Sequence, residues 1–410
     1  MGICYLGTET PYSFERFKIM PPPKGYKPIY ISHLGRHGSR YITSGTDAKE
    51  LYEVLSDAGS KKMLTTKGYR LKSKVKHFLQ LSNGKYGLLT MRGIQEEMGI
   101  GRRMYLRNPE AFGKEVEATS TYVTRAKQSM EAFLKGLGQF VSTSTFIATV
   151  NDEIDPILRF FDLNTAYLKY KKDREWIQSV HIFEQRAEVA EPFLSQFFEK
   201  RYRINILEPL KIATTIYDIY ANTFNMNVNL GLSQYFTQEQ LCYFWENENL
   251  QNYLEKGPSY IGQNLPTDIS FALLRRFIEE ADEAIEKRDK SATLRFAHAE
   301  TIIPFVSLLG LRGGSKQTND LNEVSKIWRD CNISPMAANL QFIFYASKEE
   351  KDILVKLLYN EKEYPLPFET AHYPYYEWKE IRAFYMKVLQ ALPIPKDESV
   401  VLQVKNFNEV

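Results

Sequence analysis

The chain has 410 residues, of which 43% are hydrophobic and 25% are charged. This length predicts two or three domains, and the composition is that of a globular protein, which excludes a disordered chain and a collagen. The net charge is +3, from 53 Lys and Arg against 50 Asp and Glu, whereas a general nucleic-acid-binding protein usually carries a larger basic excess. No run of 18 apolar residues is present, so no transmembrane helix is expected. Strong anion binding would have to come from a local cluster.

The three cysteines, Cys4, Cys242 and Cys331, are too few for a disulfide framework. One bridge is possible, but none of them lies in a CxxC pair or beside a histidine at metal-ligand spacing, so buried or idle thiols are expected. The first fourteen residues lack the basic start and apolar stretch of a signal peptide. The protein is therefore expected to be cytosolic or to have lost its targeting segment.

A short apolar run over residues 28–34 predicts a buried strand. A polar turn follows it, with the sequence Gly35-Arg36-His37-Gly38-Ser39-Arg40. Residues 61–82 and 90–107 carry helical patterns with Lys and Arg on their polar faces. Each helix is preceded by a similar five-residue segment, Leu64-Thr65-Thr66-Lys67-Gly68 and Leu89-Thr90-Met91-Arg92-Gly93. Two similar segments of this length do not indicate a repeat protein.

The rest of the chain alternates between strand and helix, except in its middle. Residues 115–121 predict a strand, and a helical pattern begins at Arg125 and stops near Gly138. From about 150 to 290 the sequence is typical of helices rich in aromatics. The elements expected after that are a strand over 293–298, a helix over 301–311, strands over 339–346, 352–359 and 364–366, and a helix over 378–392.

This order of elements predicts an α/β fold with a mixed, mostly parallel sheet layered by helices and an inserted, mainly α-helical domain. The α/β catalytic domain is expected to be discontinuous, formed by residues 1–135 and 290–410. The helical insertion, expected to select the substrate, would span residues 136–289.

Several signatures of other chemistries are absent, among them the P-loop, the dinucleotide-binding glycines, the nucleophile elbow and H-E-x-x-H. The glycine-rich segment 310–316 has the wrong spacing for a phosphate cradle and is interpreted as a flexible connection. None of the six histidines pairs at metal-ligand spacing, so neither a catalytic metal nor a cofactor is expected.

His37 lies in the turn directly after the first strand, between Arg36 and Arg40. Ligands of open α/β sheets bind at the carboxyl ends of strands. Two guanidinium groups would keep the imidazole neutral by repulsion unless an anion lay among them, and phosphate suits the forked donors of Arg. A neutral imidazole is also a competent nucleophile toward phosphorus. Taken alone, the motif equally fits a basic surface loop with an incidental histidine.

Two further segments place polar side chains at strand ends. Arg125 opens a helix after the second strand, and His298-Ala299-Glu300 stands between a later strand and helix. Each alone fits an ordinary helix start. Together they would bring arginines, histidines and a carboxylate to one edge of the sheet, where a Glu can act as general acid on a leaving oxygen.

At this point the residues resemble a known family. Arg36-His37-Gly38-Ser39-Arg40 matches the R-H-G-x-R motif of the histidine acid phosphatases (clade 2), which include phytases. His298-Ala299-Glu300 resembles the H-A-E signature of the multiple inositol polyphosphate phosphatases, where other phytases carry H-D. Arg125 resembles the third phosphate-binding arginine, and the likeness extends over roughly residues 25–370. Tyr41 departs from the Pro toward which many members continue, and also resembles the inositol polyphosphate subgroup.

The resemblance implies a phosphomonoesterase that hydrolyses inositol polyphosphates such as phytate through a phosphohistidine. His37 would be the nucleophile and Glu300 the general acid. The phosphate oxygens would be held by Arg36, Arg40, Arg125 and His298. An acidic optimum is expected, because Glu300 must begin protonated while His37 begins neutral.

Substrate selection is expected to come from basic residues outside the motifs, since a polyphosphorylated inositol is strongly anionic. The candidates are Lys67, Arg92, Lys169, Lys171 and Lys172, with Arg174 in the same basic run. For any single lysine, a solvated helix face is an equally ordinary explanation.

Three other functions stay open. The first is a broad-specificity acid or sugar phosphatase of the same family, the second a phosphohistidine-dependent mutase, and the third a non-catalytic protein that binds phosphorylated ligands. Members of the family are usually exported, so a periplasmic or secreted protein with a trimmed signal peptide is expected, with a cytoplasmic location as the alternative. The expected partner is a small phosphate ester, with no nucleic acid and no membrane span.

Overall fold

The computed structural model describes residues 4–15, 18–141, 143–173, 176, 189–203, 208–396 and 399–408. Its central feature is a mixed β-sheet with the strand order β3-β2-β4-β1-β5-β6-β7, and β8 also pairs with β6. The strands are β1 (Lys27–Arg36), β2 (Glu115–Ser120), β3 (Phe146–Val150), β4 (Lys290–Ala297), β5 (Asn339–Ala346), β6 (Leu354–Tyr359), β7 (Lys362–Glu363) and β8 (Tyr376–Glu377).

Four neighbouring strands, β3, β2, β4 and β1, run parallel, whereas β5 to β8 are antiparallel to their neighbours. Arg36 at the end of β1 pairs with Ala297 of β4, and Phe296 pairs with Ser120 at the end of β2. Three parallel strands therefore end at one edge of the sheet, where the residues that follow them meet. The predicted α/β class, with a mixed sheet and a helical insert region, is confirmed.

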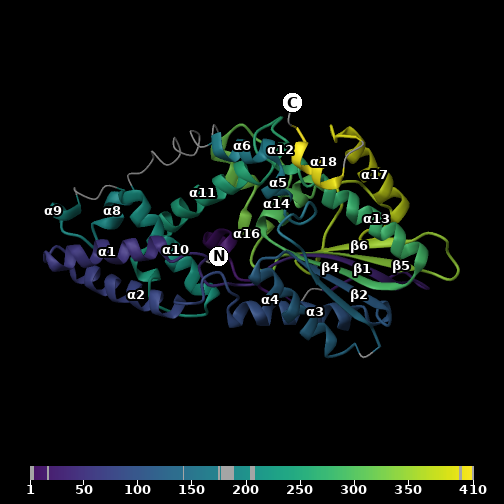
Figure 1. The fold of residues 1–410 in the computed structure, drawn as a ribbon, viewed down its shortest axis with the longest axis horizontal. Helices are drawn as coiled ribbons and strands as arrows, with labels where there is room; N and C mark the ends of the chain where they lie inside the picture. The colour runs from purple at the N-terminus through teal and green to yellow at the C-terminus, as the bar shows by residue number, and fades with distance from the viewer. Residues whose placement is uncertain are drawn as a thin grey trace.

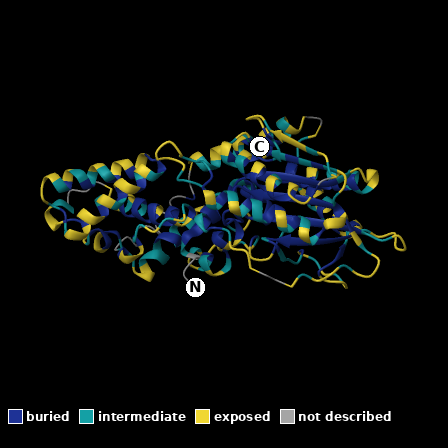
Figure 2. Cartoon of the chain, turned by 90° about the horizontal axis from the view of Figure 1, so that it is seen from below, coloured by how far each residue is buried: buried dark blue, intermediate teal, exposed yellow. Residues whose placement is uncertain are grey.

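Helices cover both faces of the sheet (Figure 1). On one face, α3 (Met91–Arg107) and α4 (Thr124–Gly138) pack against strand residues such as Ile31 and Leu294. On the other, α13 (Phe271–Lys287), α14 (Ala299–Leu308) and α17 (Trp378–Ala391) pack against residues such as Tyr30 and Phe342. Successive side chains of a strand point to opposite faces, so the central strands are buried on both sides and dark blue in Figure 2.

A second body, built from helices, extends beyond the sheet (Figure 1). Its core is rich in aromatics, among them Phe193, Tyr217 and Phe244. It joins α1 (Thr46–Ser60), α2 (Thr66–Ser82), α8 (Ala190–Leu194), α10 (Pro209–Asn225) and the first part of α11 (Gln238–Glu255).

The predicted domain limits at 136 and 289 stay a prediction, but two features cross them. Helices α1 and α2 precede residue 136 and nevertheless pack into the helical body. Strand β3 lies between the two limits and is one of the edge strands of the sheet. Hydrophobic burial, rather than position along the chain, decides which body each element joins.

The remaining helices are short. They are η1 (Cys4–Glu9), η2 (Pro109–Ala111), α5 (Phe160–Leu163), α6 (Thr165–Asp173), α9 (Lys200–Arg203), η3 (Ser233–Tyr235), α12 (Leu265–Asp268), η4 (Leu321–Glu323), α15 (Val324–Ile327), α16 (Asp330–Ile333) and α18 (Val400–Asn406). Among the described residues, no helix is both long and apolar enough to cross a membrane.

The two similar segments, 64–68 and 89–93, contain the N-caps of α2 and α3. The hydroxyl oxygens of Thr65 and Thr90 accept hydrogen bonds from the backbone N–H of Gly68 and Gly93, respectively. The helix expected over 61–82 therefore begins only at Thr66, and a separate helix precedes it. A cap satisfies the first free N–H groups, which fixes the helix start more sharply than periodicity does.

Two other expectations were wrong in detail. The third late strand is Lys362–Glu363 rather than 364–366, because Asn360 and Glu361, with φ of 49° and 62°, form the tight turn by themselves. Cys331 is disulfide-bonded, whereas Cys242 is free, so the expectation of idle thiols fails at Cys331. Spacing alone does not show which distant cysteines meet.

Candidate active site

The predicted catalytic segments meet at the carboxyl edge of the parallel strands. His37 follows β1, and His298 follows β4 as the N-cap residue of α14. Arg125 lies in the first turn of α4, shortly after β2. The rings of His37 and His298 are 5.5 Å apart between centroids. The structure thus brings together segments that lie far apart in the sequence.

His37 is buried and oriented for attack through Nε2. Its Nδ1 lies 3.0 Å from the carbonyl oxygen of Gly38. A carbonyl only accepts, so Nδ1 carries the proton and the lone pair of the neutral ring is on Nε2. Burial, together with the charges of Arg125 and Arg36, holds the pKa of His37 well below its ordinary value. The imidazole is therefore neutral, as a nucleophile must be.

Three arginines surround this imidazole. Arg36 Nη1 donates to the carbonyl oxygens of Thr8 and Ser334, both at 2.6 Å, and Arg40 Nη2 is 2.6 Å from a carboxylate oxygen of Glu9. Burial lowers the pKa of Arg36 and of Arg125 to about 10, so both stay charged at neutral pH.

A buried donor without a hydrogen-bond partner lies on each of these arginines. The Nε atoms of Arg36, Arg40 and Arg125 are buried and make no hydrogen bond. An unpaired buried donor is costly, and clustered like charges repel. An anion with several oxygens would relieve both penalties.

Hydrogen bonds to helices α3 and α4 fix the loop from Gly38 to Arg40. Gly38 N donates to Ser129 Oγ at 3.1 Å. Ser39 donates through its N–H and its hydroxyl to the two carboxylate oxygens of Glu96, both at 2.8 Å. A Cβ on Gly93 would stand 2.1 Å from the carbonyl oxygen of Ser39, so α3 begins in direct backbone contact with the loop. Glu96 could not be identified from the sequence, because its helix offers no local sign of this partner.

His298 has a defined tautomer. Its Nε2 lies 3.1 Å from Arg159 Nη1 and 2.9 Å from Thr121 Oγ1. Guanidinium only donates, so Nε2 accepts and Nδ1 carries the proton of the neutral ring. Nδ1 is buried and has no partner. Burial and the nearby Arg125 hold the pKa of His298 well below its ordinary value. The ring therefore offers a neutral N–H donor to the site.

Arg159 is a fourth arginine of the site and was missed from the sequence. It lies just before α5, its guanidinium packs over the ring of Tyr122 with 4.9 Å between guanidinium carbon and ring centroid, and it pairs with Asp162. Its Nε is also buried and unpartnered. Recognising residues 146–150 as a strand could have revealed Arg159, because the segment 151–159 follows the end of that strand. These residues lie within the helical insertion that the sequence predicts.

Glu300 stands in the first turn of α14 with its carboxylate 3.2 Å from Lys256 Nζ. Burial alone would raise the pKa of Glu300, but the charge of Lys256, together with a backbone hydrogen bond and the charge of Arg36, leaves this pKa below its ordinary range. Without bound substrate, Glu300 is therefore ionised, contrary to the expectation that it begins protonated. An anion bound at the arginines would oppose this shift.

The predicted substrate-binding lysines and arginine lie farther apart from one another than the predicted catalytic residues do. Lys67 is exposed and bonds Gln196, and Arg92 bonds Asn227. Lys169 and Lys172 are exposed on α6. Lys171 pairs with Glu255, the neighbour of Lys256. Within the described residues, no hydrogen bond or ion pair joins any of these five to the central histidines. Arg174 lies outside the described residues.

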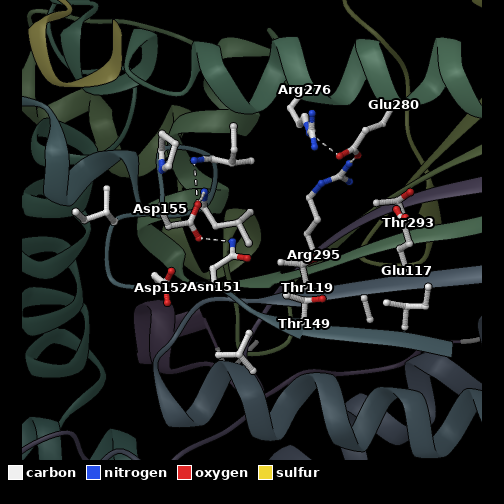
Figure 3. A pocket seen from close by; sticks show the side chains of 17 residues that line it. Glu117, Thr119, Thr149, Asn151, Asp152, Asp155, Arg276, Glu280, Thr293 and Arg295 are labelled. Carbon is white, nitrogen blue, oxygen red and sulfur yellow. Dashed lines mark hydrogen bonds and ion pairs between the residues drawn. The ribbon is translucent and has the colours of Figure 1, made fainter. Parts of the chain in front are cut away.

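Figure 3 shows a separate cavity of about 550 Å³. Strands β2, β3 and β4, helix α13 and the loop 151–158 line it. Arg295 points across it from β4 toward Glu280, which also pairs with Arg276 at 2.8 Å. None of the predicted site residues lines this cavity. In the described part of the chain, no group of three or more His, Cys, Asp or Glu side chains could hold a metal ion.

Solved structures of the same fold share the whole architecture. Bifidobacterium longum multiple inositol polyphosphate phosphatase, in complex with inositol hexasulfate, matches with a TM-score of 0.82 at 23% identity, over 93% of this chain and 97% of that chain. The phytase from D. castellii matches with a TM-score of 0.71 at 17% identity, over 98% of this chain and 87% of that chain.

The sequence comparisons identify the family. Human multiple inositol polyphosphate phosphatase 1 is 23% identical over 431 aligned positions, covering 94% of this chain and 87% of that protein. The model of the histidine phosphatase superfamily (branch 2) matches residues 31–360, which contain the segments predicted to be catalytic. The resemblance inferred from the motifs is thus confirmed: the chain belongs to branch 2 of the histidine phosphatase superfamily.

Proposed function

We propose that this protein hydrolyses phosphomonoesters of inositol polyphosphates, phytate among them, through a phosphohistidine on His37. One observation carries the proposal. A neutral imidazole with a free Nε2 lies among three arginines whose buried Nε donors lack partners. A binding module would need only the cations, whereas a nucleophile in a fixed tautomer serves a reaction.

The first step transfers the phosphoryl group to the enzyme. His37 Nε2 bonds to phosphorus in line as the bond from phosphorus to the ester oxygen breaks. Protonated Glu300 gives its proton to the departing oxygen, because an alkoxide leaves poorly. The guanidinium groups and His298 Nδ1–H bind the equatorial oxygens and offset their charge.

The second step returns the enzyme to its starting state. Glu300, now a carboxylate, accepts a proton from water as the water oxygen bonds to phosphorus and the bond from phosphorus to Nε2 breaks. Inorganic phosphate leaves and His37 is neutral again. Because the first step needs protonated Glu300 and its pKa is low in the free enzyme, activity is expected to rise toward acidic pH.

The inositol substrate class is supported by two relatives. One is named for multiple inositol polyphosphates, and another was solved with inositol hexasulfate. Both are only 23% identical to this chain, so the substrate is a proposal. The exposed cations Lys67, Lys169 and Lys172, together with Arg92 and Lys171, are proposed as secondary contacts to a polyanion.

The decisive experiment measures phosphate release from inositol hexakisphosphate, glucose phosphates and p-nitrophenyl phosphate, for wild type and His37→Ala. We expect preference for the inositol substrate and loss of nearly all activity in the variant. Equal rates on all esters would indicate a broad-specificity phosphatase. Phosphoryl return to a second hydroxyl of the product would indicate a mutase, and ligand binding without release would indicate a non-catalytic binding protein.

We also propose that the protein works in the periplasm or outside the cell. The disulfide at Cys331 supports this, since disulfides persist in oxidising compartments. Cell fractionation with an antibody tests the location, and recovery of the protein in the cytoplasmic fraction would contradict it.

A further inference from the structure

The carboxylate of Glu300 is held by a lysine that the sequence did not single out. Lys256 is the C-cap residue of α11, and its Nζ lies 3.2 Å from Glu300 Oε1 and 3.1 Å from Asn252 Oδ1. Asn252 Nδ2 in turn donates to Asp330 Oδ2 at 3.0 Å. Since the amide oxygen accepts and the amide nitrogen donates, these bonds fix the Asn252 side chain and the ammonium group that it holds.

Lys256 keeps its charge in this half-buried position. Burial would lower its pKa, but the carboxylates of Glu300, Glu255 and Glu248 outweigh burial and raise this pKa above its ordinary value. Lys256 therefore stays an ammonium through the whole range in which the enzyme is expected to work.

Other charged and titratable groups also face Glu300. Of these, His298 is neutral, and the Arg36 guanidinium donates to the carbonyl oxygens of Thr8 and Ser334. Within the described ranges, Lys256 is the one cation in ion-pair contact with the Glu300 carboxylate. The groups of the described residues that interact with Glu300 include Lys256 at the end of α11, His298 before α14, Arg36 at the end of β1, Arg125 on α4 and Tyr167 on α6.

We propose that Lys256 is a positioning residue that anchors Glu300 at the reacting ester and decides how acidic the solution must be before Glu300 carries a proton. The inference rests on the proposed function, in which Glu300 serves first as acid and then as base. The ammonium stabilises the carboxylate form by attraction over 3.2 Å. It makes Glu300 a stronger acid toward the leaving oxygen, while restricting the protonated form to lower pH.

A direct titration of Glu300 tests the proposal without relying on activity. The protein is labelled with ¹³C at the glutamate side-chain carboxyl, and Glu300→Gln identifies the resonance. Lys256→Met should raise the midpoint of this titration by about 1–3 pH units, the usual effect of removing an adjacent opposite charge. Lys256→Arg, which keeps the charge, should restore most of the shift.

The chain offers a matched control. Lys290 and Glu117 form an ion pair at 2.9 Å with side-chain exposures of 17% and 33%, against 17% and 32% for Lys256 and Glu300. This pair involves the amino end of β4, the end opposite to His298. Lys290→Met removes a comparable pair and should leave the Glu300 midpoint unchanged.

The pH dependence of kcat provides the second readout. In Lys256→Met, the pH at which kcat falls on the alkaline side should increase together with the midpoint of the Glu300 titration. A purely structural role would lower kcat at every pH, and a substrate contact would raise KM alone, in both cases without changing the pH of this fall. An unchanged Glu300 midpoint in Lys256→Met overturns the inference. If wild type releases no phosphate from any ester, the proposed function fails, while the titration still decides whether Lys256 controls Glu300.

Discussion

His33 is a buried imidazole four residues before the proposed nucleophile. Its ring packs against those of Phe133 and Phe296, with centroid distances of 4.9 and 5.4 Å, and its Nδ1 has no hydrogen-bond partner. Burial lowers the pKa of His33 to about 3, and the charge of Arg295 acts in the same direction. The folded protein therefore holds this ring neutral, whereas the unfolded chain protonates it at about pH 6.5.

This difference predicts a loss of stability in acid. Below about pH 6.5 the unfolded state binds a proton that the folded state does not, so His33 lowers the free energy of unfolding as the pH falls from about 6.5 toward 3. At pH 5 its share should be about 2 kcal/mol. We expect His33→Leu, which has a similar volume, to flatten the decline between pH 7 and pH 5 in urea unfolding.

The exposed His77 on α2 provides the control, because its side chain lies in solvent whether the chain is folded or not. His77→Leu should keep the wild-type decline. An equally steep decline in His33→Leu and in wild type would contradict the assignment to His33.

At the scale of elements, the N-terminus of α3 determines the shape of the catalytic loop. Thr90 caps the helix and its hydroxyl also donates to the carbonyl oxygen of Asn225, at 2.7 Å. Gly93 lets the first turn touch the backbone of Ser39. The similar segment at Thr65 and Gly68 does the same for another partner, since a Cβ on Gly68 would stand 2.1 Å from the carbonyl oxygen of Phe197. In both repeated segments, a threonine caps the helix and a glycine three residues later lets the first turn lie against the backbone of another segment.

Gly93→Ala should therefore damage both stability and catalysis. The new Cβ would meet backbone that cannot yield without moving the loop from Gly38 to Arg40. We expect the free energy of unfolding to fall by about 1–3 kcal/mol from overpacking and kcat/KM to fall on the order of 100-fold from the displaced loop. Denaturant unfolding and phosphate release measure the two effects.

Gly138→Ala is the matched control in α4, because a Cβ there would meet no atom within 4 Å. It should leave activity unchanged and stability equal or slightly higher. Wild-type kinetics in Gly93→Ala would show that the close approach of α3 does not shape the site.

At the scale of the whole molecule, one buried carboxylate ties three distant parts of the chain together. Glu361, in the turn between β6 and β7, accepts hydrogen bonds from Arg103 and Arg107 of α3 and from the hydroxyl of Tyr12. Its side chain is 1% exposed. One carboxylate thus links the hairpin of β6 and β7 to helix α3 and to the N-terminal segment.

We expect Glu361→Gln to lower the free energy of unfolding by about 3–5 kcal/mol, because two guanidinium groups would lose the buried carboxylate that they share. Thermal and denaturant unfolding check this. Glu15→Gln removes an exposed pair with Lys362 and should cost less than about 1 kcal/mol. Equal losses in the two variants would contradict the importance of the buried network.

The proposed site is assembled across both bodies. Glu9 of the N-terminal segment pairs with Arg40 and accepts a hydrogen bond from Asn225 at the end of α10, at 2.7 Å. The amide oxygen of the same Asn225 lies 3.0 Å from the hydroxyl oxygen of Ser39. The helical body thus holds the catalytic loop, so a change in how it packs against the sheet would reach the arginines directly.

The sequence by itself determined the fold class and the central residues of the site. His37 with its arginines, Arg125 and His298 with Glu300 each follow a recognisable strand, and parallel strands bring their carboxyl ends to one edge. Strand ends, helix caps and contiguous motifs are local properties of the chain, which is why they can be read without a structure.

Only the tertiary structure decided which residues serve these groups. Arg159, Lys256 and Glu9 lie in segments without periodic or motif signals. Their partners within the site are His298, Glu300 and Arg40, which are all distant from them in the chain. The assignment of α1 and α2 to the helical body and the disulfide at Cys331 were hidden in the same way. A lone charged side chain looks alike in sequence whether it faces water or a buried carboxylate, since the difference in free energy arises only when folding removes the water.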